Sequence, residues 1–373
     1  MKTNYLQWYK ELQARLGAKT KASFLVSSAV SQPTDLLLTH LQEFSNRETA
    51  RFQELSKGWG YAALAASIAQ RYGVDQSCVA TTNGVSNGIY LICRAILNER
   101  SHVIIESPVY EPLVAAPDFI GCRISYVRRR PPAYGIDPDE ISHAATPHTK
   151  LVILSNLHNP SGAFLTDKML TEIAQRARAV SPNVLIVVDE VYHDFVADHQ
   201  RPAATLDDGF ISLNSLTKVY GLGCLHCGWI IAPPNVVSRV TQLQLLVEGS
   251  YPSLLQSFSA YVLARLDEYL THSKKIVKQN QPLVEDCAGR LIETGILAGD
   301  VPDRGCIYFP KVNTTDATDT FVEKLAEDFG VYVVPGRFFG ESGHVRLGFG
   351  GSTPKLAESL HRFSEACFSL TAT

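Results

Sequence analysis

Short apolar runs and helical stretches alternate between residues 78 and 232 of this chain. The apolar runs have the length and composition of buried strands and predict strands at 78–81, 103–106, 123–127, 151–155, 184–189, 210–213 and 228–232. The stretches between them predict helices at 86–97, 110–120 and 168–180. This alternation is typical of an α/β fold, in which a mainly parallel sheet has helices on both faces and active residues at the carboxyl ends of its strands.

The segments on either side of this region predict further units. Residues 1–45 have the pattern of an N-terminal arm that contributes to a small domain, with helices at 5–16 and 36–44. A large domain is expected at 46–280, including a helix at 62–72 and helical sequence from 236 to 278. Residues 281–373 predict a smaller α+β domain, with helices near 283–294, 319–329 and 355–368 and strands near 306–310, 331–334 and 344–348.

The charge balance excludes some classes of partner. The chain has 373 residues, with 34 Lys and Arg against 37 Asp and Glu and a net charge of −3. This balance gives no electrostatic basis for binding nucleic acid or an anionic membrane. The first residues are polar and amphipathic, and no apolar run approaches the length of a membrane span, which predicts a soluble cytoplasmic protein.

Eight cysteines are scattered along the chain, mostly in apolar surroundings, which is typical of buried reduced thiols. Cys224 and Cys227 form a CxxC pair with His226 between them. A zinc site needs a second ligand pair at suitable spacing, and none stands out in the sequence. A thioredoxin-like redox pair lacks its usual context, so we interpret the pair as structural and predict no metal site.

Lys218 follows the apolar run 210–213 and precedes glycines at 221, 223 and 228. An ammonium group at the end of a buried strand loses hydration, which lowers its pKa and makes the amine nucleophilic. Such an amine can form a Schiff base with an aldehyde cofactor. A lone lysine of this kind is more often a surface loop residue, so the interpretation depends on the other motifs.

Two motifs follow the first strands of the alternating region. Gly84 permits a tight turn and Ser86 opens a helix, and free N–H groups with a hydroxyl at a helix N-terminus bind phosphate. The segment is neither a Walker A motif nor GxGxxG, so alone it is a weak signal. Tyr110 follows Pro108 at the next strand end, where an aromatic ring either stacks on a planar ligand or packs as an ordinary core residue.

Three polar residues follow the central strands. Asn159 begins the turn sequence NPSG, and its amide can also donate to a phenolate oxygen. Asp189 ends a strongly apolar run, where a carboxylate is costly unless it pairs with a cation such as a protonated pyridine nitrogen. Tyr192 lies three residues further on and can reach the same ring. Metal binding by Asp189 and Glu190 is the alternative, which we rank lower.

Together these motifs resemble a known family. NPSG (159–162), DEVY (189–192), SLTKVYGLGCLHCGW (215–229) and PGRFFGESGHVRLGFG (335–350) occur in the order found in class I/II aminotransferases, which use pyridoxal 5′-phosphate (PLP). The resemblance covers nearly the whole chain. It implies the PLP-dependent transferase fold type I, with a large, mainly parallel sheet domain sandwiched by helices and a smaller α+β domain. It also implies a homodimer whose active sites are shared at the interface.

The resemblance assigns a role to each cofactor residue. Lys218 forms the Schiff base with PLP and moves the Cα proton of the substrate, and Asp189 keeps the pyridine nitrogen protonated. Tyr192 and Asn159 bind the ring oxygen, and Tyr110 stacks on the ring. The phosphate is cradled by Gly84, Val85, Ser86 and Ser215.

Substrate residues follow from the same resemblance. Arg346 grips the α-carboxylate in a bidentate fork, which suits guanidinium geometry, and Asn159 is also assigned to the substrate site. Trp59 falls where the family often has a tyrosine that reaches into the partner subunit's site. Acidic residues near the site would favour a cationic side chain, and Glu11 and Glu111 are candidates, although we interpret both as solvated surface charges.

The sequence departs from the family pattern at three places. His226 stands eight residues after the lysine, where the family has an arginine bound to the cofactor phosphate. A histidine is shorter and can be neutral near pH 7, so phosphate binding is expected to be weaker unless another group compensates. The segments DRGCIYF (303–309) and SFLVSSAVSQPTD (23–35) are also unusual. These departures indicate a specialised relative.

The motifs predict a PLP enzyme that acts on an α-amino acid, and aminotransfer is the main interpretation. Loss of a leaving group at Cβ or Cγ is the alternative, as in cyclases resembling capreomycidine synthase that act on hydroxylated arginines, because one fold hosts both reactions. A PLP-binding regulator normally carries a fused DNA-binding module, for which there is no spare length or basic segment here. A nicotinamide dehydrogenase requires GxGxxG after the first strand, which is absent.

Overall fold

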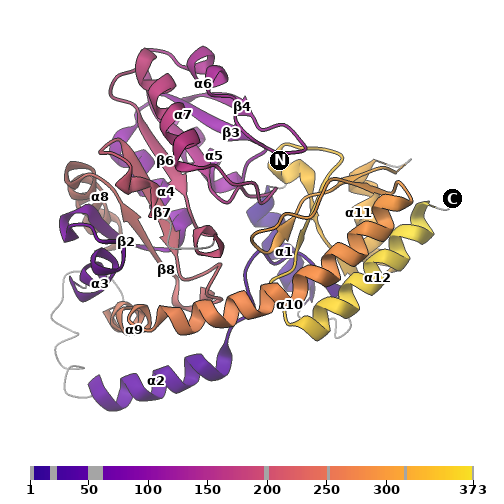
Figure 1. The fold of residues 1–373 in the computed structure, drawn as a ribbon. Helices are drawn as coiled ribbons and strands as arrows, with labels where there is room; N and C mark the ends of the chain where they lie inside the picture. The colour runs from indigo at the N-terminus through magenta and orange to yellow at the C-terminus, as the bar shows by residue number, and fades with distance from the viewer. Residues whose placement is uncertain are drawn as a thin grey trace.

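The computed structural model describes residues 4–16, 23–48, 62–196, 201–249, 253–314 and 317–371. A seven-stranded sheet in the order β2-β8-β7-β6-β5-β3-β4 forms its centre (Figure 1). The strands are β2 (Val79–Asn83), β3 (His102–Ser107), β4 (Arg123–Arg128), β5 (Thr149–Ser155), β6 (Leu185–Asp189), β7 (Phe210–Ser215) and β8 (Cys227–Ile231). Only the two pairs that involve β8 are antiparallel, so the predicted mainly parallel sheet and its seven strands are confirmed.

Helices cover both faces of this sheet because successive side chains of a strand point to opposite sides. In β3, Ile105 packs in the cluster of one face and Ile104 in the cluster of the other. The first face is covered by α4 (Gly84–Ile96), α5 (Glu111–Ile120) and α8 (Pro234–Glu248). The second is covered by α6 (Pro138–Ala144) and α7 (Asp167–Val180), and near β8 by α3 (Ala62–Tyr72) and α9 (Ser253–Leu263).

The C-terminal unit has its own core. A three-stranded antiparallel sheet joins β10 (Ile307–Tyr308), β14 (Val345–Gly348) and β13 (Val334–Pro335), and a second small sheet pairs β9 (Leu297–Ala298) with β11 (Lys311–Val312). The helices of this unit are α11 (Thr318–Asp328) and α12 (Thr353–Thr371), and α12 packs along α10 (Leu266–Glu293) (Figure 1). The N-terminal arm contributes β1 (Ser23–Phe24), which pairs with β12 (Val331–Tyr332) of this unit.

The predicted helical sequence from 236 to 278 is confirmed within the described residues, where it forms α8, α9 and most of α10. The structure corrects the boundary that follows: α10 continues through Pro282 to Glu293, so the helix predicted near 283–294 is the C-terminal part of α10. Asn280 holds α10 in place there, because its Nδ2 donates to the carbonyls of Phe349 and Gly351. Helix α6 was not predicted.

The arm contains α1 (Tyr5–Leu16) and α2 (Thr34–Glu48). α1 has the predicted bounds, and α2 extends beyond the predicted 36–44 at both ends. The predicted division of the chain at residue 280 falls inside α10 and stays a prediction. Among the helices of the described ranges, none combines the length and the apolar character that a membrane crossing requires.

Candidate active site

The carboxyl ends of β2, β3, β5, β6 and β7 point to one edge of the sheet, where a cavity of about 190 Å³ lies. Nine residues predicted for the site line this cavity: Gly84, Val85, Ser86, Tyr110, Asn159, Asp189, Ser215, Lys218 and His226. Two other predicted residues, Tyr192 and Arg346, do not line the cavity but lie next to it. Arg346 hydrogen-bonds to Asn159, and Tyr192 hydrogen-bonds to the carbonyl of Ser28. Trp59 lies outside the described residues.

Lys218 enters the cavity from the turn that follows β7. Its Nζ donates a hydrogen bond to Ser28 Oγ at 3.1 Å, and its carbonyl accepts from Val30 N at 3.0 Å. Burial lowers the pKa of Lys218 below its ordinary value, while the Tyr5 phenol opposes this shift. A lowered pKa increases the share of uncharged amine, which is the form that attacks an aldehyde.

The N-terminal segment reaches Lys218 because a glycine lets the two backbones approach. Gly221 has a φ of +68°, and a Cβ atom there would lie 2.8 Å from the carbonyl oxygen of Ser31. Any side chain at 221 would therefore push this segment, with Ser28, away from Lys218.

Asp189 ends β6 and is 5% exposed. Its Oδ1 accepts a hydrogen bond from Val191 N at 3.2 Å. Burial raises the pKa of Asp189 to about 7, and this backbone N–H and the charge of Lys218 only partly offset the effect. A buried carboxylate in this state gains free energy from a cation placed against it, which a protonated pyridine nitrogen provides.

The turn from β2 into α4 has the features of a phosphate cradle. Gly84 begins the helix with a φ of +77°, and the N-cap Asn83 makes no side-chain hydrogen bond to the N–H groups of the first turn. Ser215 Oγ accepts from Thr217 N at 3.3 Å, which leaves the hydroxyl proton of Ser215 available to donate. A Cβ at Gly228 would lie 2.8 Å from the carbonyl carbon of Gly84, so only glycine lets β8 pass this close to the cradle.

His226 lines the cavity from the residue before β8, with a φ of 46°. Its Nδ1 lies 3.8 Å from the position that a Cβ on Gly84 would take, which places the imidazole beside the cradle. Among the described residues that line the cavity, Lys218 and His226 are the two with basic side chains. The predicted arginine-to-histidine departure therefore lies where it would affect a bound phosphate.

Arg346 lies on β14 and is fully buried. Its Nη1 donates to Asn159 Oδ1 at 3.1 Å, and its Nη2 donates to the Val26 carbonyl at 3.0 Å. Its Nε has no hydrogen-bond partner among the described residues. An unpaired donor on a buried guanidinium is costly, and a carboxylate ligand would satisfy it.

Tyr192 is fully buried just outside the cavity lining. Its hydroxyl donates to the Ser28 carbonyl at 2.8 Å, so it supports the segment that contacts Lys218. The contact with a ring oxygen that the sequence predicts for Tyr192 stays a prediction.

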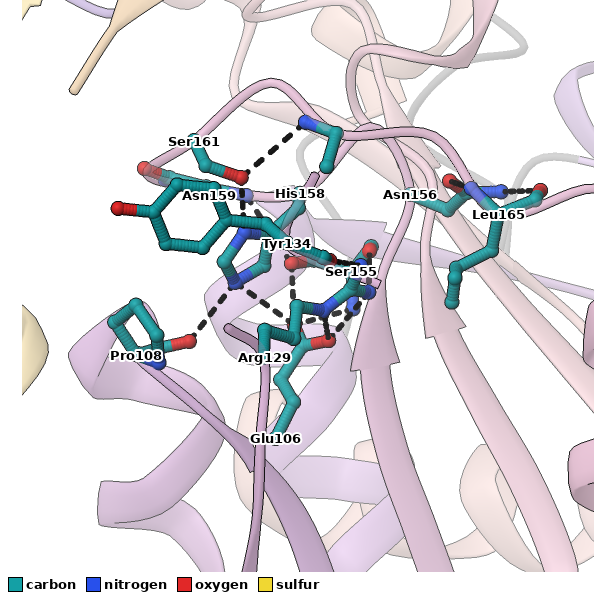
Figure 2. A network of polar contacts seen from close by, with 11 residues as sticks. Glu106, Pro108, Arg129, Tyr134, Ser155, Asn156, His158, Asn159, Ser161 and Leu165 are labelled. Atoms are coloured by element: carbon teal, nitrogen blue, oxygen red, sulfur yellow. Dashed lines mark hydrogen bonds and ion pairs between the residues drawn. The ribbon is translucent and has the colours of Figure 1, made fainter. Parts of the chain in front are cut away.

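A buried polar network lies beneath Asn159 (Figure 2). Glu106 pairs with Arg129 and accepts from Ser155 N and Oγ, at 2.7 and 2.6 Å from Oε1. Ser155 Oγ in turn accepts from Asn159 N at 3.2 Å. Burial raises the pKa of Glu106, and the paired guanidinium opposes the shift. The network thus fixes the backbone from which Asn159 reaches the cavity.

His158 links this turn to the segment that carries Tyr110 (Figure 2). Its Nε2 lies 2.9 Å from the Pro108 carbonyl, which can only accept, so Nε2 carries the proton. Nδ1 then accepts from Ser161 Oγ at 2.6 Å. Burial lowers the pKa of His158 well below its ordinary value, which keeps the ring neutral and this hydrogen-bond pattern fixed.

Several residues of the site have no motif in the sequence. Ser28, Tyr5 and the Glu106–Arg129 pair reach it from distant segments, and the sequence separation of the Tyr5–Arg346 contact is 341. The unusual segment 23–35 was the only signal for Ser28. Tyr5 had no signal beyond its place on an amphipathic helix.

The donor set fits PLP. A helix N-terminus with adjacent hydroxyls suits its phosphate, the amine of Lys218 suits its aldehyde, and the buried Asp189 suits its ring nitrogen. The other features of the described residues do not indicate a metal site, since no group of three potential metal ligands is found among them. All eight cysteines are free thiols, with Cys224 exposed and Cys227 buried.

Comparison with known proteins agrees with this fit. The sequence profile of the family described as "Aminotransferase class I and II" matches residues 27–363. Capreomycidine synthase of Streptomyces vinaceus is 29% identical over 309 residues, which cover 82% of this chain and 77% of that protein. An arginine–pyruvate transaminase of Pseudomonas aeruginosa is 27% identical over 319 residues, 82% of this chain and 80% of that protein.

The fold is shared with solved structures. The crystal structure of a PLP-dependent aminotransferase from Streptococcus suis aligns with a TM-score of 0.86 over 99% of both chains, at 22% sequence identity. The predicted fold class is therefore confirmed. With its profile match over most of its length, the chain belongs to the class I and II aminotransferase family, and it is an enzyme that depends on pyridoxal 5′-phosphate.

Proposed function

We propose that this enzyme transfers the amino group of an α-amino acid, with Lys218 as the residue that moves the Cα proton. The observation that carries the proposal is the assembly of Lys218, Asp189 and the Arg346–Asn159 pair around one cavity. These groups supply an amine, a buried carboxylate and a carboxylate receptor, which are the three functions that the reaction needs at one place.

Each residue has a separate task in this reaction. When bound, PLP supplies an aldehyde for the substrate amino group and an electron-poor ring that stabilises negative charge at Cα. Arg346 holds the substrate carboxylate through its unpaired Nε and thereby orients the Cα–H bond. Lys218 Nζ, whose lowered pKa favours the uncharged amine, would accept the proton from Cα, and aminotransfer requires that proton to go to the former aldehyde carbon of PLP instead of back to Cα. Asp189 holds the proton at the ring nitrogen, and the pairing lowers its own pKa.

A single-turnover reaction without any keto acid tests the proposal. Holoenzyme is mixed with a panel of amino acids that includes arginine and hydroxylated arginines, and the cofactor spectrum and product masses are followed together. Conversion of PLP to its pyridoxamine form, with a matching keto acid, is the expected result. PLP that returns unchanged while the amino acid loses water or ammonia would instead establish the second candidate function.

That second candidate is elimination or cyclisation of a hydroxylated arginine-like amino acid. It is supported by the 29% identity to capreomycidine synthase, which exceeds the 27% identity to the arginine–pyruvate transaminase. The same deprotonation by Lys218 starts both reactions, and they diverge only when a group leaves from Cβ or Cγ.

Arginine is in the panel because one relative is named for arginine, and not because of acidic residues in the cavity. Glu111 Oε2 accepts from Leu6 N at 3.2 Å, and Glu11 is exposed and accepts from Gln7 Nε2. Neither Glu11 nor Glu111 lines the cavity, which agrees with their interpretation from the sequence as surface charges. Selectivity for a cationic side chain stays part of the proposal.

We expect His226→Arg to tighten PLP binding about tenfold. A permanent guanidinium replaces an imidazole beside the phosphate cradle and adds a charge-assisted hydrogen bond to the phosphate. The measurement is the PLP dissociation constant of the apo-protein, from quenching of intrinsic fluorescence at pH 8. The exposed His361, changed to Arg, is the control. Equal affinities of wild type and His226→Arg would show that His226 does not face the phosphate.

We also propose that the chain is a homodimer, as is usual in the family. Large apolar side chains are exposed at the end of α8 and the start of α9, with Leu246 84% and Val247 65% exposed. Leu38 on the neighbouring α2 is 57% exposed as well. Exposed large apolar side chains of this kind are typical of an interface. Sedimentation of the holoenzyme at the mass of one chain would contradict the proposal.

A further inference from the structure

α1 places Tyr5 in the active site. Tyr5 is 7% exposed, and its ring contacts Tyr110 edge to face at a centroid distance of 5.7 Å. It also packs edge to face against Phe338 at 5.8 Å. Tyr110 lines the cavity, so the ring of Tyr5 packs directly behind a residue of the cavity wall.

The hydroxyl of Tyr5 faces the guanidinium of Arg346. It lies 3.4 Å from Nη2, and the guanidinium carbon lies 5.8 Å from the centre of the Tyr5 ring. The phenol on α1 is therefore next to the arginine of the site.

The other donors of Arg346 show what Tyr5 does in this arrangement. Nη1 is engaged by Asn159 and one Nη2 proton by the Val26 carbonyl, while Nε is unpaired. The contact with Tyr5 is long for a hydrogen bond, so it is easily replaced. A phenol oxygen that accepts from Arg346 can rotate its own O–H toward a bound carboxylate and donate to it.

We propose that Tyr5 binds the substrate α-carboxylate together with Arg346, and that α1 is thereby a part of the substrate site. Arg346 supplies the charge, and Tyr5 supplies a second, neutral donor. The helix is held at its first turn by the hydrogen bond from Leu6 N to Glu111 and by Trp8, which packs on Phe338 at 5.1 Å. The inference rests on the proposed function of Arg346.

The test compares two probes that differ in a carboxylate. Aminooxyacetate and methoxyamine both displace Lys218 from PLP, and only aminooxyacetate carries a carboxylate. Their second-order rate constants are measured by absorbance with wild-type holoenzyme, with Tyr5→Phe, and with Tyr9→Phe as the control on the same helix. The ratio of the two rate constants measures carboxylate recognition, and a general loss of stability would lower both rates without changing the ratio.

We expect wild type and Tyr9→Phe to prefer aminooxyacetate equally, and Tyr5→Phe to lower this preference about tenfold, since a hydrogen bond to a charged group is lost. Tyr5→Phe with the wild-type ratio would overturn the role of Tyr5. The result that overturns the proposed function is a different one: a wild-type enzyme that reacts with both probes at the same rate, which would mean that Arg346 does not act on carboxylates either.

Discussion

Lys218→Ala lowers turnover by about four orders of magnitude and removes the absorbance of the Schiff base from the holoenzyme. The size of the effect reflects two losses, the covalent attachment of PLP and the general base, and a positioned base alone contributes up to about 10⁴-fold. The fold is expected to persist, because Lys218 makes one side-chain hydrogen bond, to Ser28. Turnover is measured with the amino acid identified in the single-turnover experiment.

The control for this variant is Lys168→Ala, since Lys168 is on α7 with its side chain 86% exposed. It is expected to keep wild-type turnover and absorbance. If Lys218→Ala retained the Schiff base absorbance, another lysine would hold the cofactor and the assignment of this cavity would be wrong.

Asp189→Asn is expected to reduce turnover by about 10²–10³-fold, the effect of removing a preorganised charge from a buried site. An amide cannot stabilise a protonated ring nitrogen, so the ring draws electrons less strongly. PLP still attaches to Lys218 in this variant, which separates its effect from that of Lys218→Ala. Single-turnover rates at saturating amino acid measure the loss.

Although Asp189→Asn is expected to lower turnover, it is expected to stabilise the apo-protein. Burial raises the folded-state pKa of Asp189 to about 7 from an ordinary value of 3.8, so the folded state binds more protons than the unfolded state between these values. The contribution of Asp189 to stability is therefore present at low pH and is lost as the pH rises through this window. Asparagine stays neutral at all these pH values. The free energy of unfolding of apo Asp189→Asn is therefore expected to exceed that of the wild type by up to about 4 kcal/mol at pH 8.

Urea denaturation of both apo-proteins at pH 4.5 and pH 8 measures this difference. The difference in free energy of unfolding between the variant and the wild type should be small at pH 4.5 and large at pH 8. A gain that does not change with pH would show that Asp189 has no raised pKa in the apo-protein, and the reason given for its pairing with a ring nitrogen would be lost.

The central sheet was predictable from the sequence because its strands are nearly continuous apolar runs. The apolar run that ends at Asp189 is buried on both faces of the sheet. Apolar runs and helical stretches alternate clearly in this part of the sequence. Residues at strand ends, together with the family resemblance, then identified nine residues that line one cavity. Most of them meet because parallel strands end at one edge of the sheet.

The N-terminal contribution was not predictable in the same way. Ser28 and Tyr5 contact residues 190 and 341 positions away. Ser28 lies in the irregular segment after β1 and Tyr5 in a helix, and no local pattern specifies how either of them packs. The buried Glu106–Arg129 pair is similar, because each residue alone has the appearance of a surface charge in the sequence. Long-range pairing of this kind becomes visible only when the tertiary structure places both partners.

The continuity of α10 has a related cause. Proline inside a helix removes one hydrogen bond, and this predicts a break near Pro282. The helix continues because its neighbouring Asn280 is tied to two carbonyls of the C-terminal unit and Val284 is buried in the core of that unit. Tertiary contacts here outweigh the local cost of the proline.

The most direct test of this account is to locate the cofactor on the chain. Holoenzyme is reduced with borohydride, which makes the bond between PLP and its lysine permanent, and the digested protein is analysed by mass spectrometry. The account predicts a single pyridoxyl group on the peptide that contains Lys218. A pyridoxyl group on another lysine, or on none, would contradict it.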